Sequence, residues 1–320
     1  MWDHGLKIRL DITMGLSIFL LGTGALIYQI TVKLEGRWWR CHHQAMSTFR
    51  ISDDQVARFR ADGYLRVPAM LDREETSLLV EAARGDSGMI DQAFGVDDRE
   101  GNPARLTLWY HPGDDVYGMV SRSERIVDAM EKLLADEVYH YHSKMILKEA
   151  RIGGAWEWHQ DYGYWYQNGC LFPDMASVYI ALDAATRENG CIELLTGSHR
   201  LGRIEHGQFG GQQCADPEHT DVAAERLETY YGELEPGDAL FFHANTLHRS
   251  AANHTDAPRW GLICCYNTRH NDPYKDSHHP RYTPLKRVGD DAIKQVGATG
   301  SAAGQEFMDR EADATTAGER

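Results

Sequence analysis

The sequence has no excess of basic residues, no CxxC pair and no internal repeat. Its 33 Lys and Arg face 48 Asp and Glu, which gives a formal net charge of −15. Such a surface repels phosphate backbones and disfavours a nucleic-acid-binding function. The six cysteines show no zinc-site spacing, and reduced thiols in a cytosolic protein are their simplest interpretation. An apolar content of 42% and a charged content of 25% exclude a wholly disordered or fibrous protein.

An uncharged run covers residues 12–32 near the start of the chain. A helix of this length can cross a bilayer core of about 30 Å. The basic residues Lys33, Arg37 and Arg40 follow it, so such an anchor would leave the bulk of the chain in the cytoplasm. Two alternatives stay open, namely a signal peptide and an upstream extension ahead of a natural start at Met46.

Composition divides the chain into three parts. Residues 1–45 form the N-terminal segment that contains this run. Residues 46–287 carry the periodic patterns of a folded domain, in which the catalytic chemistry is expected. Residues 288–320 are rich in Gly, Ala, Thr and Asp with few large apolar side chains, and this composition predicts a disordered acidic tail.

The first part of the folded domain is expected to be helical. Ser52 and Gln55 form a capping box, and Gly63 supplies the stop of that helix. Asp72 caps a second helix, and a third begins at Ser121 with apolar residues at helical spacing. We expect these helices to pack on a sheet.

The rest of the folded domain changes to short strands separated by Gly, Pro, Asn and Asp turns. The expected strands are 64–67, 138–147, 177–182, 191–195, 239–242, 247–251 and 260–266. This pattern predicts a mainly β fold with flanking helices, in the form of a sandwich or jelly roll rather than a parallel α/β sheet.

A candidate metal site begins with His159-Gln160-Asp161. On an extended segment, side chains two residues apart point the same way, so His159 and Asp161 share a face. An imidazole and a carboxylate on one face make two corners of the triad that binds non-haem Fe(II). An HxD alone is usually a surface or hydrogen-bonded pair, and the hypothesis therefore needs a third ligand.

His248 is the candidate third ligand. If the segment around it is extended, His248 and Ser250 share a face, and a following hairpin brings Arg259 alongside. A guanidinium with a neighbouring hydroxyl suits the far end of a dicarboxylate, which it grips in a bidentate manner. His243 is an alternative ligand, although a regular strand would turn it away from His248, and without Ser250 and Arg259 the residues do not decide between them.

Taken together, these motifs resemble the iron and 2-oxoglutarate motifs of the phytanoyl-CoA dioxygenase family. The matching residues are the HQD at 159–161, His248 followed by Ser250, and Arg259. Further matching pieces are Phe59-Arg60-Ala61-Asp62-Gly63-Tyr64, Glu188-Asn189-Gly190-Cys191, Gly197-Ser198-His199 and Pro236-Gly237-Asp238. The resemblance runs from about Ile51 to about Tyr282. Each piece is short, but the set in this order is a strong signal.

The resemblance implies a double-stranded β-helix, a cupin-like jelly roll, with iron at its open mouth. His159, Asp161 and His248 would hold Fe(II), and Arg259 with Ser250 would anchor 2-oxoglutarate. Dioxygen would be the second co-substrate, and the products would be succinate, CO2 and a hydroxylated compound. Because Asp161 fills the position that a halide takes in halogenating relatives, hydroxylation is favoured over halogenation.

Three further residues are candidates for the co-substrate pocket. Trp165 and Tyr179 fall where the family lines that pocket, although Tyr179 departs from the Trp more usual there. Lys144 is a second choice for a co-substrate contact, and regular alternation would place it on one face with His140 and His142. A core or solvated role for the two histidines is an equal alternative.

Two other groups of residues have both a functional and a structural interpretation. An aromatic cluster around the HQD lines a substrate pocket or belongs to the core; it comprises Trp156, Trp158, Tyr162, Tyr164 and Tyr166. The His-rich segment 269–281 is a lid over the mouth or a surface loop. His199 follows a Gly-Ser turn and is expected to be a hydrogen-bonded turn residue.

The predicted function is that of an Fe(II)- and 2-oxoglutarate-dependent dioxygenase that hydroxylates an unactivated C–H bond of a small organic molecule. One alternative keeps the barrel and the metal but not 2-oxoglutarate, as in a non-redox metalloenzyme. Another is a membrane-tethered metal-binding or sensor module without oxygenase activity.

Overall fold

The computed structural model describes residues 13–20, 26–34, 37–43, 49–209, 211–301 and 307–308. The chain forms two compact units, Met1–Phe49 and Arg50–Arg320. Met46, the alternative start expected from the sequence, lies outside the described residues.

The first unit contains three antiparallel strands, β1 (Thr13–Leu20), β2 (Leu26–Leu34) and β3 (Arg37–His43). Strands therefore occupy the described part of 12–32, and the expectation of a helix there is wrong. The physical reason lies in composition, because four of the six residues 27–32 are β-branched and one is aromatic, and such residues favour a pleated strand. Among the described residues, no helix combines the length and apolar character needed to cross a membrane.

The second unit is built on a large sheet with the strand order β4-β14-β9-β16-β7-β6-β5. All neighbouring pairs in it are antiparallel. Its strands are β4 (Tyr64–Val67), β5 (Phe94–Asp97), β6 (Pro103–Trp109), β7 (Val138–Lys148), β9 (Met175–Ala181), β14 (Ala239–His243) and β16 (Arg259–Thr268). The central strand β16 is buried along its whole length, as its run of apolar residues predicts.

A smaller antiparallel sheet has the order β13-β10-β15-β8. Its strands are β8 (Trp156–His159), β10 (Ile192–Leu195), β13 (Thr229–Gly232) and β15 (His248–Ser250). A separate hairpin joins β11 (His206–Phe209) to β12 (Gln212–Ala215). One hydrophobic cluster contains Tyr179 and Ile263 of the large sheet and Leu194 of the small one, so the two sheets pack face to face.

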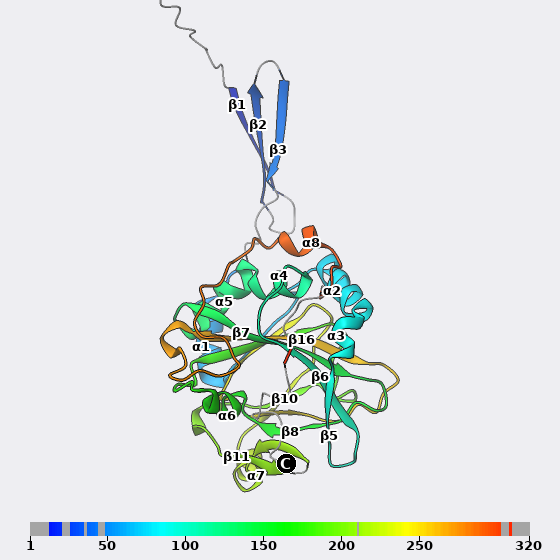
Figure 1. Ribbon diagram of the computed structural model, residues 1–320. Coiled ribbons are helices and arrows are strands. Elements are labelled where there is room, and N and C mark those ends of the chain that lie inside the picture. The colour runs from blue at the N-terminus through cyan, green and yellow to red at the C-terminus, as the bar shows by residue number, and fades with distance from the viewer. Residues whose placement is uncertain are drawn as a thin grey trace, which may run out of the picture. The chain divides into compact units, whose positions relative to one another are not determined.

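Some of the helices cover the other face of the large sheet (Figure 1). The helices are α1 (Asp53–Asp62), α2 (Arg73–Gly85), α3 (Ser87–Asp91), α4 (Val116–Arg122), α5 (Glu124–Leu134), α6 (Asp161–Trp165), α7 (Pro217–Arg226) and α8 (Ala292–Val296), with short 3-10 turns η1 (Tyr166–Asn168), η2 (Ser198–Leu201) and η3 (Arg269–Asn271). In Figure 1, α2, α4 and α5 lie on the side of β7 and β16 away from β8 and β10. The capping box of Ser52 and Gln55 and the left-handed Gly63 (φ 86°) bound α1 as predicted.

Two packed antiparallel sheets with flanking helices confirm the expected mainly β, jelly-roll fold class. Every strand expected in the domain overlaps an observed one. The site therefore has to lie between the sheets, where the inward side chains of β7, β9 and β16 face those of β8 and β15.

The expectation of a disordered tail is wrong over 288–301. Val288 pairs with Ser123, α8 forms, and Ile293 is fully buried. Arg125 bonds Asp290 through its backbone N–H, so α5 holds this segment by polar contacts as well. Because the segment has few apolar residues, these contacts could not be predicted from the sequence. Residues 302–306 and 309–320 of the expected tail lie outside the described residues.

A β-bulge in β7 changes which side chains face the other sheet. His142 pairs with Cys265 of β16 and His140 with the next residue, Tyr266, which leaves Tyr141 as the extra residue. Because adjacent residues of a strand face opposite ways, the bulge separates His140 from His142. The expectation that both share a face with Lys144 is therefore wrong, and only His142 lies on the side of Lys144.

Candidate active site

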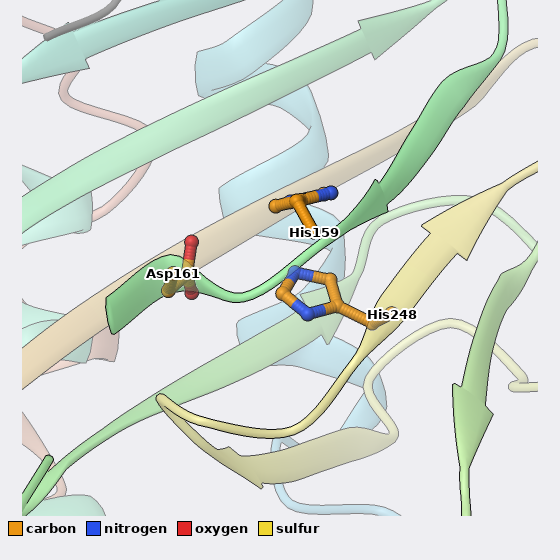
Figure 2. Close-up of side chains that lie close together, drawn as sticks. All are labelled: His159, Asp161 and His248. Atoms are coloured by element: carbon orange, nitrogen blue, oxygen red, sulfur yellow. The ribbon is translucent and has the colours of Figure 1, made fainter. Parts of the chain in front are cut away.

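Three side chains from distant parts of the chain converge between the sheets. His159 ends β8, Asp161 begins α6, and His248 begins β15. Ligand atoms of all three lie within 4.8 Å of one another. Figure 2 shows the two imidazoles and the carboxylate around one common space.

Strand pairing places the two histidines. His159 and His248 are directly opposed on β8 and β15, and their ring centroids are 4.1 Å apart. After Gln160 the chain turns into α6, which carries the Asp161 carboxylate to the same side. The positions of the three side chains therefore depend on the pairing of His159 with His248 and on the turn at Gln160.

Each imidazole is oriented by a backbone carbonyl. Nδ1 of His159 donates to the carbonyl of Glu157 at 2.7 Å, and Nδ1 of His248 donates to that of Thr246 at 2.9 Å. A carbonyl can only accept, so in each ring the proton sits on Nδ1 and Nε2 keeps its lone pair. This arrangement is typical of histidines that bind metals through Nε2.

The charge states suit metal binding. Burial lowers the pKa of His159 and of His248, which keeps both imidazoles neutral at pH 7. Burial would raise the pKa of Asp161, but the ammonium of Lys144 at 3.1 Å outweighs it, and this pKa is lowered to about 2. Ser177 donates a second hydrogen bond to Asp161 at 3.0 Å. The site therefore offers two neutral nitrogens and one anionic oxygen.

Two imidazoles and a carboxylate on one face leave the other positions of a metal open. This donor set is the facial triad of non-haem Fe(II) oxygenases, and it fits ferrous iron by the chemistry of its atoms. A closed zinc site would instead need a fourth protein ligand.

A buried positive charge, the guanidinium of Arg259, lies at the start of β16. Arg259 is 2% exposed, donates from Nη2 to the carbonyl of Gly190 at 2.7 Å and from Nη1 to the hydroxyl of Tyr179 at 3.4 Å. Its Nε is buried without a hydrogen-bond partner. Arg259, Tyr179 and Ser250 all line the same cavity as the triad. An unpartnered guanidinium nitrogen inside a cavity is suited to an anionic ligand.

Lys148 is a further buried residue beside Arg259, and it could not be identified as a site residue from the sequence. It pairs with Arg259 across β7 and β16, and it donates to Ser250 Oγ at 3.0 Å and to the carbonyls of Gly154 and Ala251. Burial, followed by the charge of Arg259, holds the pKa of Lys148 well below its usual value. Lysines at strand ends are usually exposed, so no local pattern marks this one.

The other predicted site residues divide into two groups. Trp165, Tyr179 and Lys144 line the cavity, with Lys144 paired to Asp161. His243 instead packs beside Phe59 and His199, outside the residues that line the cavity.

The aromatic cluster and the His-rich segment each contribute part of the cavity wall. Trp156 and Tyr164 line it, whereas the hydroxyl of Tyr162 bonds a backbone carbonyl and Tyr166 is exposed. Within 269–281, His279 is buried against the cavity. These placements depend on tertiary packing and could not be read from the spacing of aromatic or histidine residues.

Gln160, between the two ligands, has a structural role that the motif alone does not suggest. Its fully buried amide donates to the carbonyls of Gly202 and Asn245 and accepts from the backbone N–H of Ile204 at 2.8 Å. It therefore ties the HQD turn to the loops before β11 and β15, which fixes the position of Asp161 relative to His248.

Comparisons with known proteins agree with this geometry. The family model described as phytanoyl-CoA dioxygenase (PhyH) matches residues 59–261. The chain is 31% identical over 237 residues to the L-proline trans-4-hydroxylase of Streptomyces griseoviridis, covering 69% of this chain and 88% of that protein. It is 27% identical over 250 residues to the ectoine dioxygenase of Bordetella bronchiseptica, covering 72% and 80% respectively.

A solved structure shares the arrangement of the fold. The crystal structure of EctD from S. alaskensis with 2-oxoglutarate and 5-hydroxyectoine superposes with a TM-score of 0.61 at 25% identity, covering 76% of this chain and 86% of that one. Sequence, fold and donor set lead to one assignment: the chain belongs to the phytanoyl-CoA dioxygenase family of Fe(II)- and 2-oxoglutarate-dependent oxygenases.

Proposed function

We propose that this protein hydroxylates an unactivated C–H bond of a small organic molecule, with Fe(II) as cofactor and 2-oxoglutarate and dioxygen as co-substrates. The convergence of His159, Asp161 and His248 within 4.8 Å, beside a cavity that also holds Arg259, carries the proposal. Relatives named for proline and ectoine support a small-molecule substrate. The balanced reaction consumes one 2-oxoglutarate and one dioxygen, and it releases succinate, CO2 and the hydroxylated product.

The residues have separate roles in this proposal. His159 and His248 would bind iron through Nε2, and Asp161 would bind through a carboxylate oxygen. When bound, ferrous iron supplies the activation of dioxygen that a protein side chain cannot provide. Lys144 and Ser177 hold Asp161 in place and keep it ionised, so the carboxylate does not need to lose a proton before it binds the metal.

Arg259 and Ser250 would receive the distal carboxylate of 2-oxoglutarate. The Arg259 guanidinium is buried and carries no carboxylate partner among the described residues, which leaves its charge available to a bound dianion. Tyr179 packs beside this guanidinium and limits its movement. A metalloenzyme that works without 2-oxoglutarate would have no use for a cation here, and this argues against that alternative.

The test starts from anaerobically purified, Fe(II)-loaded protein. It receives dioxygen, 2-oxoglutarate and a metabolite extract, and mass spectrometry follows succinate and any compound that gains one oxygen atom. We expect both to form in the wild type and succinate formation to fall at least about 100-fold in Arg259→Ala, because the buried ion pair with the co-substrate is lost. Arg269→Ala, an exposed arginine, is the matched control.

Two outcomes would contradict the proposal. One is a wild-type protein that binds iron and 2-oxoglutarate but forms no succinate with any extract. The other is an Arg259→Ala variant with a wild-type Michaelis constant for 2-oxoglutarate.

A further inference from the structure

A buried imidazole with an unused nitrogen lies at the cavity wall, apart from the metal ligands. His142 is 2% exposed and lines the cavity, and its Nε2 has no hydrogen-bond partner. A buried polar atom without a partner is destabilising, so its presence beside a cavity points to a ligand that completes it.

Neighbouring side chains determine whether this nitrogen donates or accepts. Nδ2 of Asn168 lies 3.1 Å from the hydroxyl of Tyr141 and 3.2 Å from Nδ1 of His279. An amide nitrogen only donates, so Nδ1 of His279 accepts and the proton of that neutral ring sits on Nε2. This Nε2 lies 3.0 Å from Nδ1 of His142, which must then accept. The remaining proton of His142 is therefore on Nε2, and it forms an N–H donor.

The surroundings keep His142 neutral and fixed. Burial is the main cause that holds its pKa well below the usual value, with the positive charge of Lys144 as the next. Its ring packs edge-on against Trp165, with centroids 5.4 Å apart, while His279 stacks on Tyr141 at 4.4 Å. A neutral, immobilised N–H donor selects for an acceptor atom by geometry rather than by charge.

Strand register places His142 at the opposite end of the site from Arg259. Along β16, Arg259 pairs with Lys148 and Cys265 pairs with His142, and this stretch spans about 20 Å at about 3.3 Å per residue. Ser250 of the facing sheet bonds Lys148 at the first end. Ser177, which bonds Asp161, pairs with Cys265 at the second end. Asp161 is therefore held at the same register as His142, and the proposed co-substrate end lies further along β16.

The other side chains that line the cavity limit which chemical groups a ligand can have. Among the described residues that line the cavity, Asp161 is the single carboxylate, and Lys144 and Ser177 already bond its two oxygens. Apolar side chains form one large part of the wall, among them Phe94, Leu106, Ile146 and Ile263. The wall therefore favours an apolar body over a strongly hydrated one.

We infer that His142 is a substrate-binding residue, which donates its Nε2–H to a carboxylate or carbonyl oxygen of a small, otherwise largely apolar substrate. His279 and Asn168 are the positioning residues that keep the proton on this nitrogen. The inference rests on the proposed function for its reaction, and it adds the chemical class of the substrate and the residue that recognises it.

The test compares His142→Leu, which removes the donor, with His142→Gln, which retains an N–H. Succinate formation by the Fe(II)-loaded protein is measured with 2-oxoglutarate alone and with a metabolite extract split by anion exchange. We expect the extract-dependent rate to fall at least tenfold in His142→Leu and to be partly kept in His142→Gln. The control Arg269→Ala, which changes an exposed side chain outside the cavity, should keep both rates within twofold of the wild type. Activity in the anionic fraction indicates a substrate with net negative charge, and activity in the unbound fraction indicates a neutral, zwitterionic or cationic substrate whose acceptor oxygen is then identified by mass spectrometry.

The outcomes separate this inference from the proposed function. A wild type without any succinate contradicts the proposed function itself. An extract-dependent rate retained in His142→Leu, or a loss of both rates together in that variant, overturns the role of His142 as a substrate donor.

A spectroscopic measurement tests the positioning residues without a substrate. Nitrogen-15 NMR of histidine-labelled protein should show His142 as the neutral Nε2–H form, and His279→Leu should change that tautomer. A His142 protonated on Nδ1 in the wild type would overturn the inference.

Discussion

The hydrogen bond that Nδ1 donates determines which nitrogen of each proposed histidine ligand can bind the metal. His159 and His248 both donate to the carbonyl two residues before them, and this leaves Nε2 toward the shared space. Asp161 is held in the same way by Lys144 and Ser177. The orientation of the three proposed ligands therefore depends on neighbours that never touch the metal.

At this scale we expect Asp161→Ala to bind Fe(II) at least about 100-fold more weakly and to lose hydroxylation, because only two neutral imidazoles remain. Iron content after dialysis and succinate formation measure the two effects. Asp276→Ala removes an exposed carboxylate with 92% side-chain exposure and serves as control. An Asp161→Ala protein with full iron content and full activity would disprove the assignment of the triad.

Lys148→Met should raise the Michaelis constant for 2-oxoglutarate roughly tenfold with a smaller change in kcat, because Ser250 loses the amine that holds its hydroxyl at 3.0 Å. The measurement is steady-state turnover with 2-oxoglutarate, together with binding of 2-oxovalerate, which lacks the distal carboxylate. Binding of 2-oxovalerate should not change. In the Ser250→Ala background, Lys148→Met should have little further effect, and a full additive effect would show that Lys148 acts by another route.

At the scale of the element, close packing of β16 on β9 depends on a residue without a side chain. A Cβ on Gly261 would lie 2.2 Å from the ring of Tyr179, far inside van der Waals contact. Tyr179 in turn accepts a hydrogen bond from Arg259. The small residue near the start of β16 thus lets an aromatic ring support the guanidinium.

We therefore expect Gly261→Ala to lower the free energy of unfolding by about 1–3 kcal/mol and to raise the Michaelis constant for 2-oxoglutarate, since Tyr179 must move. Chemical denaturation and turnover assays measure these changes. Gly85→Ala is the matched control, because a Cβ there has no atom within 4 Å. Equal stability of Gly261→Ala and the wild type would show that the ring has room to shift.

The way the strands pair also limits what can be predicted from the sequence. The two-residue spacing of His159 and Asp161 suggested a shared face, although Asp161 begins α6 and does not continue β8. His248 could be chosen over His243 only through Ser250, Arg259 and the family resemblance. The bulge at Tyr141 has no sequence signal, and it reversed the expected side of His140. Lys148 was not identified, and for His142 and the segment with His279 a structural role stayed an equal alternative, because their roles arise from pairing between distant segments.

At the scale of the whole molecule, the helix considered for 12–32 was wrong for a related reason. Length and lack of charge made a membrane helix one of three alternatives, but the described residues of this run form strands β1 and β2. The predicted jelly roll, in contrast, followed from many short strands with regular turns, a pattern that extends over most of the domain.

Stability of the whole molecule should fall as the pH drops below 6.5. Burial lowers the pKa of His140 to about 3, and its neutral ring bonds the carbonyl of Tyr110 and the hydroxyl of Ser143. Between pH 6.5 and about 3 the unfolded chain binds a proton here and the folded chain does not, so the stabilising contribution is complete above pH 6.5 and decreases below it.

For His140 alone this loss amounts to about 2 kcal/mol at pH 5. We expect His140→Gln to flatten the pH dependence of the unfolding free energy by about one proton over this range. Denaturation curves at pH 5, 6 and 8 measure it, with the exposed His254→Gln as control. An identical slope in His140→Gln and wild type would contradict the role of this ring.

The direct pairing of His159 and His248 on β8 and β15 affects how the protein responds to loss of its metal ion. The ladder of backbone hydrogen bonds sets the spacing of the two rings, so their geometry does not depend on a bound ion. A ligand set held in this way survives the departure of its metal, and we expect fresh iron to restore a depleted molecule without any refolding. Repair by simple exchange of the ion would then cost the cell far less than synthesis of a new chain.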